Sequence, residues 1–281
     1  MVYLITLFAS LLSILGQILV SGETCQTDRK LLHEEILDKY RNMAVLRSVQ
    51  YNSTGGREMT SIPDCMIPRK SNFSLEIIPS LPYINMGMPK MGSSTLHTFW
   101  ICGGLKASHY WCGKRDYLPN PCGPCMFSNV QRKKKIFDGC GDFDAYTEMN
   151  YVTHAPCIWP QAQYLNEIHD DKPDATFIIV FREIHSWISS LKRWREPDGT
   201  MLHQALGKKC GISGTGVELT DKVIEDFFCR HVARVRNFVN THPSHKLVEV
   251  QLEDKETAQR MEQIFRIDSK CWRHMNQNFQ H

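Results

Sequence analysis

The sequence predicts an α/β fold in which a central parallel sheet has helices on both faces. Three short apolar segments, residues 81–87, 176–181 and 246–252, are each followed by a stretch with helical periodicity. Strands that alternate with helices in this way are typical of a parallel sheet. The unbroken apolar segment 176–181 also indicates a central strand that is buried on both faces.

The other elements follow from apolar periodicity and from the positions of Gly and Pro. A helix is expected to begin at Ser94 and to end near Gly103. Residues 107–144 are rich in Cys, Gly and Pro, and we expect them to be irregular, within a cysteine-rich insertion over 102–144. Further helices are predicted over residues 28–49, 160–171, 183–194, 218–239 and 255–265, and loops over residues 51–71 and 196–216.

The N-terminal segment indicates the secretory pathway. Residues 1–22 are almost wholly apolar and predict either a cleaved signal peptide or an uncleaved signal anchor. Both place an N-terminal region, 23–80, and a larger domain, 81–281, in the lumen. Glycosylation sequons at Asn52 and Asn72 agree with this location, as do the 11 cysteines. An odd number leaves at least one cysteine unpaired or bonded to another chain.

The composition is that of a globular protein with a sizeable core, since 42% of the residues are hydrophobic. The chain has 33 Lys and Arg against 30 Asp and Glu, a formal net charge of +3. This excess is too small to indicate a nucleic-acid partner.

The segment Cys122-Gly-Pro-Cys125 has the sequence of a thioredoxin-type redox motif. However, no buried strand precedes it, and three further cysteines lie between residues 102 and 140. A zinc site is a second alternative, with Cys112, Cys122, Cys125 and Cys140 as ligands. Because an oxidising lumen favours disulfides, we expect structural crosslinks here.

The most informative segment is residues 83–96, Tyr-Ile-Asn-Met-Gly-Met-Pro-Lys-Met-Gly-Ser-Ser-Thr-Leu. It reads as a short strand, a tight turn and the start of a helix. The turn holds Lys90, and the hydroxyls of Ser93, Ser94 and Thr95 follow it. Amide groups at a helix N-terminus, together with a nearby cation, favour an anion such as phosphate.

The same segment is close to a Walker A loop but differs from it at one position. Gly87 and Gly92 have the Walker spacing, but Ser93 stands where that motif requires Lys. The displacement of the cation to Lys90 argues against an ordinary ATPase or GTPase. A strand–turn–helix junction with a capping Ser is the purely structural alternative.

A second anion-binding candidate lies at the end of the strand 176–181. Arg182 follows this strand directly, and Ser190 lies eight residues further on, two turns into the next helix. A guanidinium offers paired donors that match phosphate oxygens. The alternative is a strand-end Arg that pairs with a carboxylate such as Glu183.

Taken in this order, the two segments resemble the sulfotransferase family that uses 3′-phosphoadenosine 5′-phosphosulfate (PAPS). Its 5′-phosphosulfate loop, roughly G-x-P-K-x-G-[TS]-[TS], corresponds to residues 87–94. Its strand-end Arg, with Ser eight positions later, corresponds to Arg182 and Ser190. The resemblance covers residues 81–265 and implies a P-loop, nucleotide-kinase-like fold. It does not cover the N-terminal region or the cysteine-rich insertion.

The resemblance also implies a role for each matched position. Lys90 would stabilise the charge on the bridging oxygen as the sulfuryl group departs. Arg182 and Ser190 would bind the 3′-phosphate. The 5′-phosphosulfate would be held by Gly87, Lys90, Gly92, Ser93, Ser94 and Thr95. No metal ion would be required, because Lys90 and the loop dipoles would supply the electrostatic stabilisation.

The residue that accepts the proton of the acceptor is a separate question. Similar carbohydrate sulfotransferases often carry a Glu shortly before a K-[TS]-P motif, where this chain has Thr153 and His154. His154 is the first candidate for the base, because a neutral imidazole accepts a proton near neutral pH. The alternatives are Glu148, Asp142 and Asp144 on the same segment and, more weakly, His97.

The resemblance therefore implies transfer of a sulfuryl group to a hydroxyl or amine of a glycan, with no nucleic-acid partner. The location would be the Golgi lumen or the secreted space, with membrane contact only through an N-terminal anchor. The basic runs 132–135 and 192–195 would attract an anionic glycan, line the donor site or remain solvated. Two alternatives remain: a degenerate P-loop kinase or NTPase, and an inactive, secreted binding protein on the same fold.

Overall fold

The computed structural model describes residues 64–69, 77–115, 118–152, 157–196, 199–208, 210, 212 and 219–273. All of them belong to the second of two compact units, Arg57–His281. The leader, the helix expected over 28–49 and both sequons lie outside the described residues.

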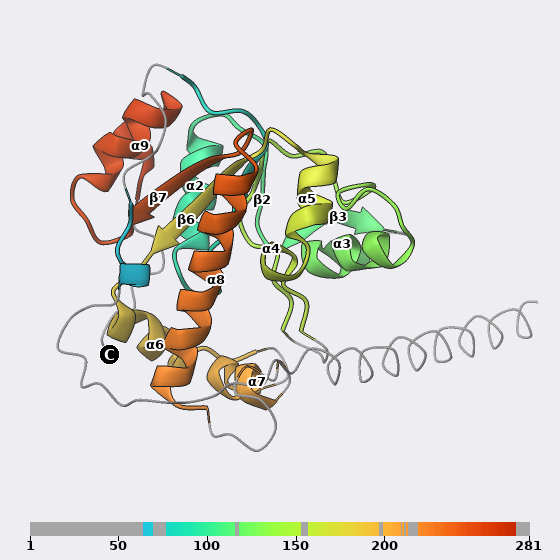
Figure 1. The fold of residues 1–281 in the computed structure, drawn as a ribbon, viewed down its shortest axis with the longest axis vertical. Helices are drawn as coiled ribbons and strands as arrows, with labels where there is room; N and C mark the ends of the chain where they lie inside the picture. The colour runs from blue at the N-terminus through green and yellow to red at the C-terminus, as the bar shows by residue number, and fades with distance from the viewer. Residues whose placement is uncertain are drawn as a thin grey trace, which may run out of the picture. The chain divides into compact units, whose positions relative to one another are not determined.

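The centre of the fold is a five-stranded sheet in which every pair of neighbouring strands is parallel. Its order is β2, β5, β1, β6 and β7 (Figure 1). The strands are β2 (Ala107–Ser108), β5 (Ala145–Tyr146), β1 (Tyr83–Asn85), β6 (Thr176–Phe181) and β7 (Lys246–Gln251). The predicted α/β class with a central parallel sheet is confirmed.

Helices cover both faces of this sheet, as predicted. In Figure 1, α8 lies on one face and α2 on the other. Four helices predicted from the sequence are present: α2 (Ser93–Cys102), α6 (Ile184–Arg193), α8 (Asp221–Thr241) and α9 (Thr257–Phe265). Their bounds agree with the sequence prediction to within about three residues, the usual uncertainty at helix ends.

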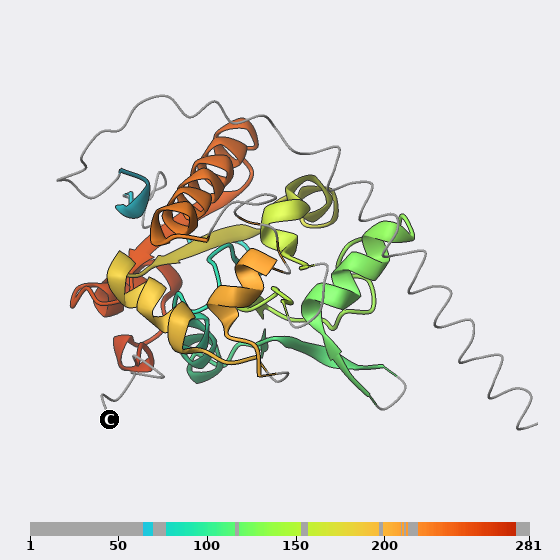
Figure 2. The same ribbon diagram turned by 90° about the horizontal axis from the view of Figure 1, so that it is seen from below.

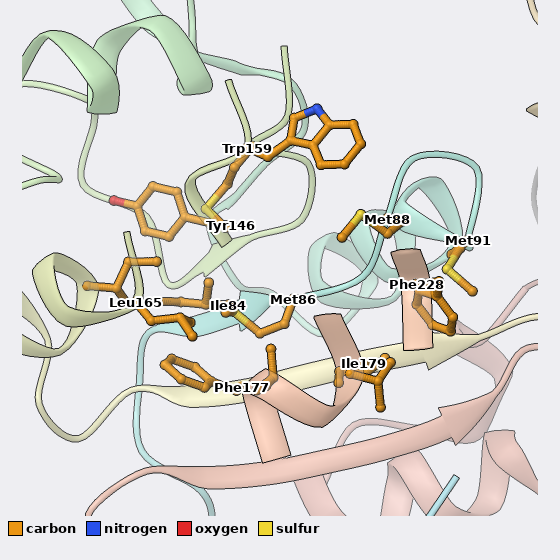
Figure 3. Packing of buried hydrophobic residues seen from close by; sticks show 14 of the residues in the cluster. Ile84, Met86, Met88, Met91, Tyr146, Trp159, Leu165, Phe177, Ile179 and Phe228 are labelled. Atoms are coloured by element: carbon orange, nitrogen blue, oxygen red, sulfur yellow. The ribbon is translucent and has the colours of Figure 1, made fainter. Parts of the chain in front are cut away.

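The strand β6 divides the core into two layers because its side chains alternate between the two faces. All six of its residues are buried. Phe177 and Ile179 belong to one hydrophobic cluster together with Phe228 of α8 (Figure 3). Ile178 and Val180 belong to a second cluster, which includes residues of α2 and α9. The expectation of a strand buried on both faces is confirmed.

The cysteine-rich insertion is more regular than predicted. Its segment β2 belongs to the central sheet, where it pairs with β5, the strand that directly follows the insertion. Between them lie an antiparallel hairpin of β3 (Trp111–Arg115) and β4 (Leu118–Pro121) and the helix α3 (Cys122–Gln131). Figure 2 shows this hairpin and helix grouped beside the sheet. The prediction of an irregular region was wrong: its many Cys, Gly and Pro residues predict loops, although the segment contains the hairpin β3–β4 and the 10-residue helix α3. The strand β2 has only two residues, too few to show periodicity.

Two other boundaries also differ from the prediction. The helix expected over 160–171 is two helices, α4 (Pro160–Gln163) and α5 (Leu165–Asp171), separated by Tyr164 with φ −127° and ψ 42°. The loop expected over 196–216 contains the helix α7 (Leu202–Lys208). Short 3₁₀ turns at Asp64–Met66 and Ser269–Cys271 complete the described elements.

Ten cysteines form five disulfides, and the eleventh, Cys25, lies outside the described residues. The pairs are Cys65–Cys229, Cys102–Cys271, Cys112–Cys122, Cys125–Cys140 and Cys157–Cys210. The two cysteines of the C-G-P-C segment therefore bond to different partners, so neither a redox pair nor a four-cysteine zinc site forms. The expected structural crosslinks are confirmed. In the described part of the chain, no helix has the length and apolar character to cross a bilayer.

Candidate anion-binding and proton-transfer site

The loop that joins β1 to α2 lies at the carboxyl end of β1, where ligands bind in parallel α/β sheets. Asn85, the last residue of β1, fixes its start: the side-chain amide donates to the carbonyl of Thr147 at 2.7 Å and accepts from the amide of Gly87 at 2.9 Å. Gln161 donates to the carbonyl of Gly87 at 3.2 Å. The first residues of the loop are therefore held by buried hydrogen bonds.

Two helices on the α8 side of the sheet hold the next part of the loop. Nε1 of Trp187, in α6, donates to the carbonyl of Pro89 at 2.8 Å. Nε2 of His231, in α8, lies 2.6 Å from the carbonyl oxygen of Met86 and must be the donor. Burial lowers the pKa of His231 to about 4, and the charge of Arg234 acts in the same direction. His231 is therefore neutral near pH 7, and its protonated nitrogen is the one that faces the loop.

The backbone of the loop has a left-handed conformation at two positions. Gly92 is the N-cap residue of α2 and has φ 96°. A Cβ atom at Gly92 would lie 3.1 Å from side-chain carbons of both Leu252 and Val180. Lys90 has φ 67°, which is uncommon for a residue other than Gly. The turn thus requires Gly at one position and sets Lys90 in a constrained backbone conformation at the other.

The three methionines of the loop are core residues. Met86, Met88 and Met91 are each at most 2% exposed and belong to the same hydrophobic cluster. Figure 3 shows them along the loop that leaves β1. These three side chains therefore anchor the loop in the hydrophobic core.

Lys90 is the cation at the centre of this loop. Its ammonium lies 3.5 Å from the centroid of the Trp194 ring, a cation–π contact. Partial burial is the largest effect on the pKa of Lys90 and lowers it, and the charge of Arg182 acts in the same direction. The carboxylates of Glu148 and Glu196 raise this pKa, but the net result is a decrease. Two carboxylates and a second cation are therefore close enough to Lys90 to affect its charge.

Arg182 brings the second predicted segment to the same loop. Its Nη1 donates to the carbonyl of Lys90 at 3.1 Å. Its Nε lies 3.4 Å from a carboxylate oxygen of Glu253, near enough for an ion pair but not aligned as a hydrogen bond. Ser190 is buried in α6, and in the described part of the chain no hydrogen bond joins it to Arg182. The structure thus places Arg182 directly beside the loop and Ser190 inside the adjacent helix.

A carboxylate lies on the other side of the loop. Glu148 follows β5, and its Oε2 accepts from the hydroxyl of Ser93 at 2.9 Å. The same oxygen lies 2.9 Å from Nε2 of His109, and Asn150 donates to Oε1 at 3.4 Å. Burial raises the pKa of Glu148, but His109, Ser93 and Asn150 together outweigh it and lower the pKa below its ordinary value. Glu148 is therefore ionised at neutral pH.

His109 follows β2 directly and completes this group. Its Nε2 lies 3.4 Å from the hydroxyl oxygens of Ser93 and Ser94. Its ring stacks on that of His97 in α2, with a centroid distance of 5.3 Å. Burial lowers the pKa of His97 to about 4, and the charge of His109 contributes in the same direction. His97 is therefore a poor proton acceptor near neutral pH.

The other acidic candidates lie at the opposite end of β5. Asp142 and Asp144 precede this strand, whereas Glu148 follows it. A carboxylate oxygen of Asp144 accepts from the amide of Lys106 at 2.8 Å, and its carbonyl accepts from Tyr83, the first residue of β1. Asp144 is therefore at the amino ends of the strands, away from Lys90. His154 and Thr153 lie outside the described residues.

Sequence reasoning identified Lys90, Arg182 and Glu148 but missed His109. The available signal was the position of His109 immediately after a strand at the carboxyl edge of the sheet. That signal was hidden because β2 is two residues long and lies in a segment expected to be irregular.

The arrangement combines a cationic loop and a helix N-terminus with an ionised carboxylate and an imidazole. Such a site can bind an anion and accept a proton in the same place. In the described part of the chain, no group of three or more His, Cys, Asp or Glu is placed to hold a metal ion. Comparison with known proteins finds no matching family model and no significantly similar curated sequence.

Proposed function

We propose that this chain is a sulfotransferase that moves a sulfuryl group from PAPS to a hydroxyl or amine of a glycan. The observation that carries the proposal is the hydrogen bond of 3.1 Å from Arg182 to the carbonyl of Lys90. It joins two separately recognised anion-binding segments, about 90 residues apart, at one edge of a parallel sheet. A donor with phosphate groups at both the 3′ and 5′ positions needs two anion-binding segments that lie within the length of one nucleotide of each other.

Two positive features at this edge suit an anionic donor, and they lie beside the carboxylates of Glu148 and Glu253. The amino end of α2 and the ammonium of Lys90 favour the 5′-phosphosulfate. Nη2 of Arg182 makes no hydrogen bond to any described residue, so it can donate to the 3′-phosphate while Nη1 holds the loop. Ser190 is 3% exposed, so it would have to reach that phosphate from a buried position in α6.

During transfer, the acceptor oxygen attacks sulfur as the bond to the bridging phosphate oxygen breaks. Lys90 would stabilise the negative charge that develops on this bridging oxygen. Most of the rate enhancement in such transfers comes from in-line positioning and electrostatic stabilisation. The constrained backbone of the loop, held by Asn85, Trp187 and His231, supports both because it fixes Lys90 before the donor binds.

Aromatic side chains beside Glu148 support a carbohydrate acceptor. The amide of Tyr110 donates to the carbonyl of Glu148 at 3.1 Å. The Tyr110 ring stacks on that of Tyr151 at a centroid distance of 6.2 Å. The ring of Trp111, which is 49% exposed, contacts the Tyr110 ring edge to face. Aromatic rings with a polar edge are suited to ligands that are apolar on one face and wet on the other, as sugar rings are.

The five disulfides fit an oxidising secretory or extracellular environment. Within that environment we propose the Golgi lumen, where glycans are accessible to modification, with secretion as the alternative. The predicted leader over residues 1–22 would direct the chain there, either as a cleaved signal or as a membrane anchor.

Calorimetry with adenosine 3′,5′-bisphosphate and, separately, with ATP and Mg²⁺ tests this proposal. We expect the wild-type chain to bind the bisphosphate and to bind ATP more weakly. Lys90→Ala and Arg182→Ala should each weaken bisphosphate binding about tenfold or more, because each removes a charge-assisted contact to phosphate, of the order of 1.5–3 kcal/mol. Lys134→Ala is the matched control, since it removes an exposed Lys that pairs with Asp138 on the insertion.

The outcomes separate the competing functions. Preference for ATP with Mg²⁺ would favour a degenerate kinase or NTPase and overturn the proposal. Bisphosphate binding without sulfation of any pooled glycan would favour an inactive binding protein. Equal losses in Lys134→Ala and Lys90→Ala would show that binding depends only on overall charge.

A further inference from the structure

We infer that His109, oriented by Glu148, is the general base that takes the proton of the acceptor. This inference rests on the proposed sulfotransferase activity and names the proton acceptor of that same site. It assigns His109 as a catalytic residue and Glu148 as its positioning residue.

The geometry fixes which nitrogen of His109 carries the proton. Its Nε2 lies 2.9 Å from Oε2 of the ionised Glu148, so Nε2 is the protonated nitrogen and donates to the carboxylate. Its Nδ1 then keeps a lone pair, and no described residue donates a hydrogen bond to it. The side chain of His109 is 31% exposed, so a substrate hydroxyl can approach. A base whose opposite nitrogen is held by a carboxylate is the arrangement that orients imidazoles for proton abstraction.

The position of this pair suits the reaction. Oε2 of Glu148 accepts from the hydroxyl of Ser93, one of the residues proposed to hold the 5′-phosphosulfate. His109 Nε2 is 3.4 Å from the same hydroxyl oxygen. The pair is therefore adjacent to the place proposed for the sulfuryl group, on the side of the loop opposite Arg182 and Glu253. An acceptor that reaches Nδ1 of His109 would approach the donor from the side away from the adenosine.

Charged and titratable groups from three parts of the fold lie around His109 and its partner Glu148. Glu148 lies after β5, His97 comes from α2, and Lys90 lies in the loop and interacts with Glu148. His97 is neutral at pH 7 because burial lowers its pKa to about 4. The closest charge to His109 is therefore the carboxylate of Glu148, which stabilises an imidazolium as it forms.

The chemical step balances with these groups. The oxygen of the acceptor hydroxyl forms a bond to sulfur, and its proton passes to Nδ1 of His109. The bond between sulfur and the bridging oxygen breaks, and its electron pair stays on the 5′-phosphate of adenosine 3′,5′-bisphosphate. The products are the sulfate ester, the bisphosphate and an imidazolium that later loses its proton to solvent.

The test compares four variants in sulfation of pooled glycans, with bisphosphate binding measured by calorimetry for each. We expect His109→Ala to lower kcat by about 10²- to 10⁴-fold, the usual contribution of a general base. Added imidazole should restore part of this loss, which it cannot do for a variant that is merely misfolded. Bisphosphate affinity should stay within about twofold, because His109 is not proposed to contact the donor.

Glu148→Gln tests the positioning role through the pH profile. Removing the negative charge makes the imidazolium less stable, so the acid limb of kcat/KM should move to lower pH, while kcat falls about tenfold or more. His203→Ala, in α7 beside Lys192 and Asp221, is the matched histidine control and should retain wild-type kcat. The fourth variant, His154→Ala, removes the base that the sequence favours, and its loss of kcat is compared with that of His109→Ala.

Each result bears on a different statement. Failure of the wild-type chain to bind the bisphosphate would overturn the proposed function, and this inference with it. Binding and turnover that survive in His109→Ala would overturn the inference alone. A larger loss of kcat in His154→Ala than in His109→Ala would assign the base to His154 instead.

Discussion

The ammonium of Lys90 lies 3.5 Å from the centroid of the Trp194 ring, and this ring is 47% exposed at the end of α6. Such a contact contributes about 0.5–1 kcal/mol at an exposed site, little enough for a bound phosphosulfate to displace it. We therefore expect adenosine 3′,5′-bisphosphate to change the tryptophan fluorescence of the chain as Lys90 moves toward the ligand. A fluorescence titration measures this change.

Two variants identify the residue that is responsible for this signal. Trp194→Phe should remove most of the fluorescence change while leaving the affinity within a few-fold. Trp111→Phe is the matched control, because Trp111 is 49% exposed and lies on β3, on the proposed acceptor side. An unchanged signal in Trp194→Phe would contradict the expected movement of Lys90.

Gly92→Ala should destabilise the folded chain by about 2–4 kcal/mol. Gly92 has φ 96°, and a Cβ atom there would lie 3.1 Å from Leu252 and Val180, so both backbone strain and close packing oppose the substitution. Denaturant unfolding with the disulfides intact measures the free energy of unfolding. Gly104→Ala is the matched control: its φ is 79°, but no atom lies within 4 Å of the new Cβ, so only a backbone cost of about 1 kcal/mol applies. Equal losses at both glycines would show that packing around Gly92 does not contribute.

Peptide mapping without reduction should recover Cys112 bonded to Cys122 and Cys125 bonded to Cys140. The Cα atoms of these pairs are 4.7 and 5.8 Å apart, within the range that a disulfide spans. The same digest after reduction and alkylation serves as the control for peptide assignment. A Cys122–Cys125 bond would contradict the fold of the insertion and would support a redox role for the C-G-P-C segment.

Acidification should destabilise the chain through His231. Burial lowers the pKa of His231 from 6.5 to about 4, so the unfolded chain binds the proton first as the pH falls. The contribution of neutral His231 is fully present above pH 6.5 and is lost as the pH falls to about 4, a change of up to about 3 kcal/mol. Unfolding free energies measured between pH 7.5 and 4.5 test this dependence.

A substitution separates His231 from the other groups that titrate in this range. His231→Gln keeps an N–H donor for the carbonyl of Met86 but cannot be protonated, so the loss of stability on acidification should be smaller than in the wild-type chain. His185→Gln, which removes an exposed imidazole in α6, is the control and should retain the wild-type dependence. The same slope in His231→Gln and in the wild-type chain would show that His231 does not link the loop to pH.

The parts of the fold predicted correctly are those with long, regular patterns. The five consecutive apolar residues of β6 and the 21 residues of α8 form patterns long enough to identify the type and burial of each element from the sequence. The two-residue strands β2 and β5 carry no such pattern. They form because their backbones pair with neighbouring strands that are distant in the chain, which is a property of the tertiary structure.

The site follows the same division. The sequence by itself determined that Lys90 lies in a Gly-containing turn before a helix, and that Arg182 ends a buried strand, because both depend on residues adjacent in the chain. Only the tertiary structure decided that Arg182 holds the carbonyl of Lys90, that the C-G-P-C cysteines bond to different partners, and that Glu148 faces His109. The contacts of Arg182 with Lys90 and of Glu148 with His109 join the ends of separate strands, and strand order in a parallel sheet is set by crossover packing that no local segment encodes. The disulfide partners depend on how the hairpin β3–β4 and α3 pack, which the spacing of the cysteines does not determine.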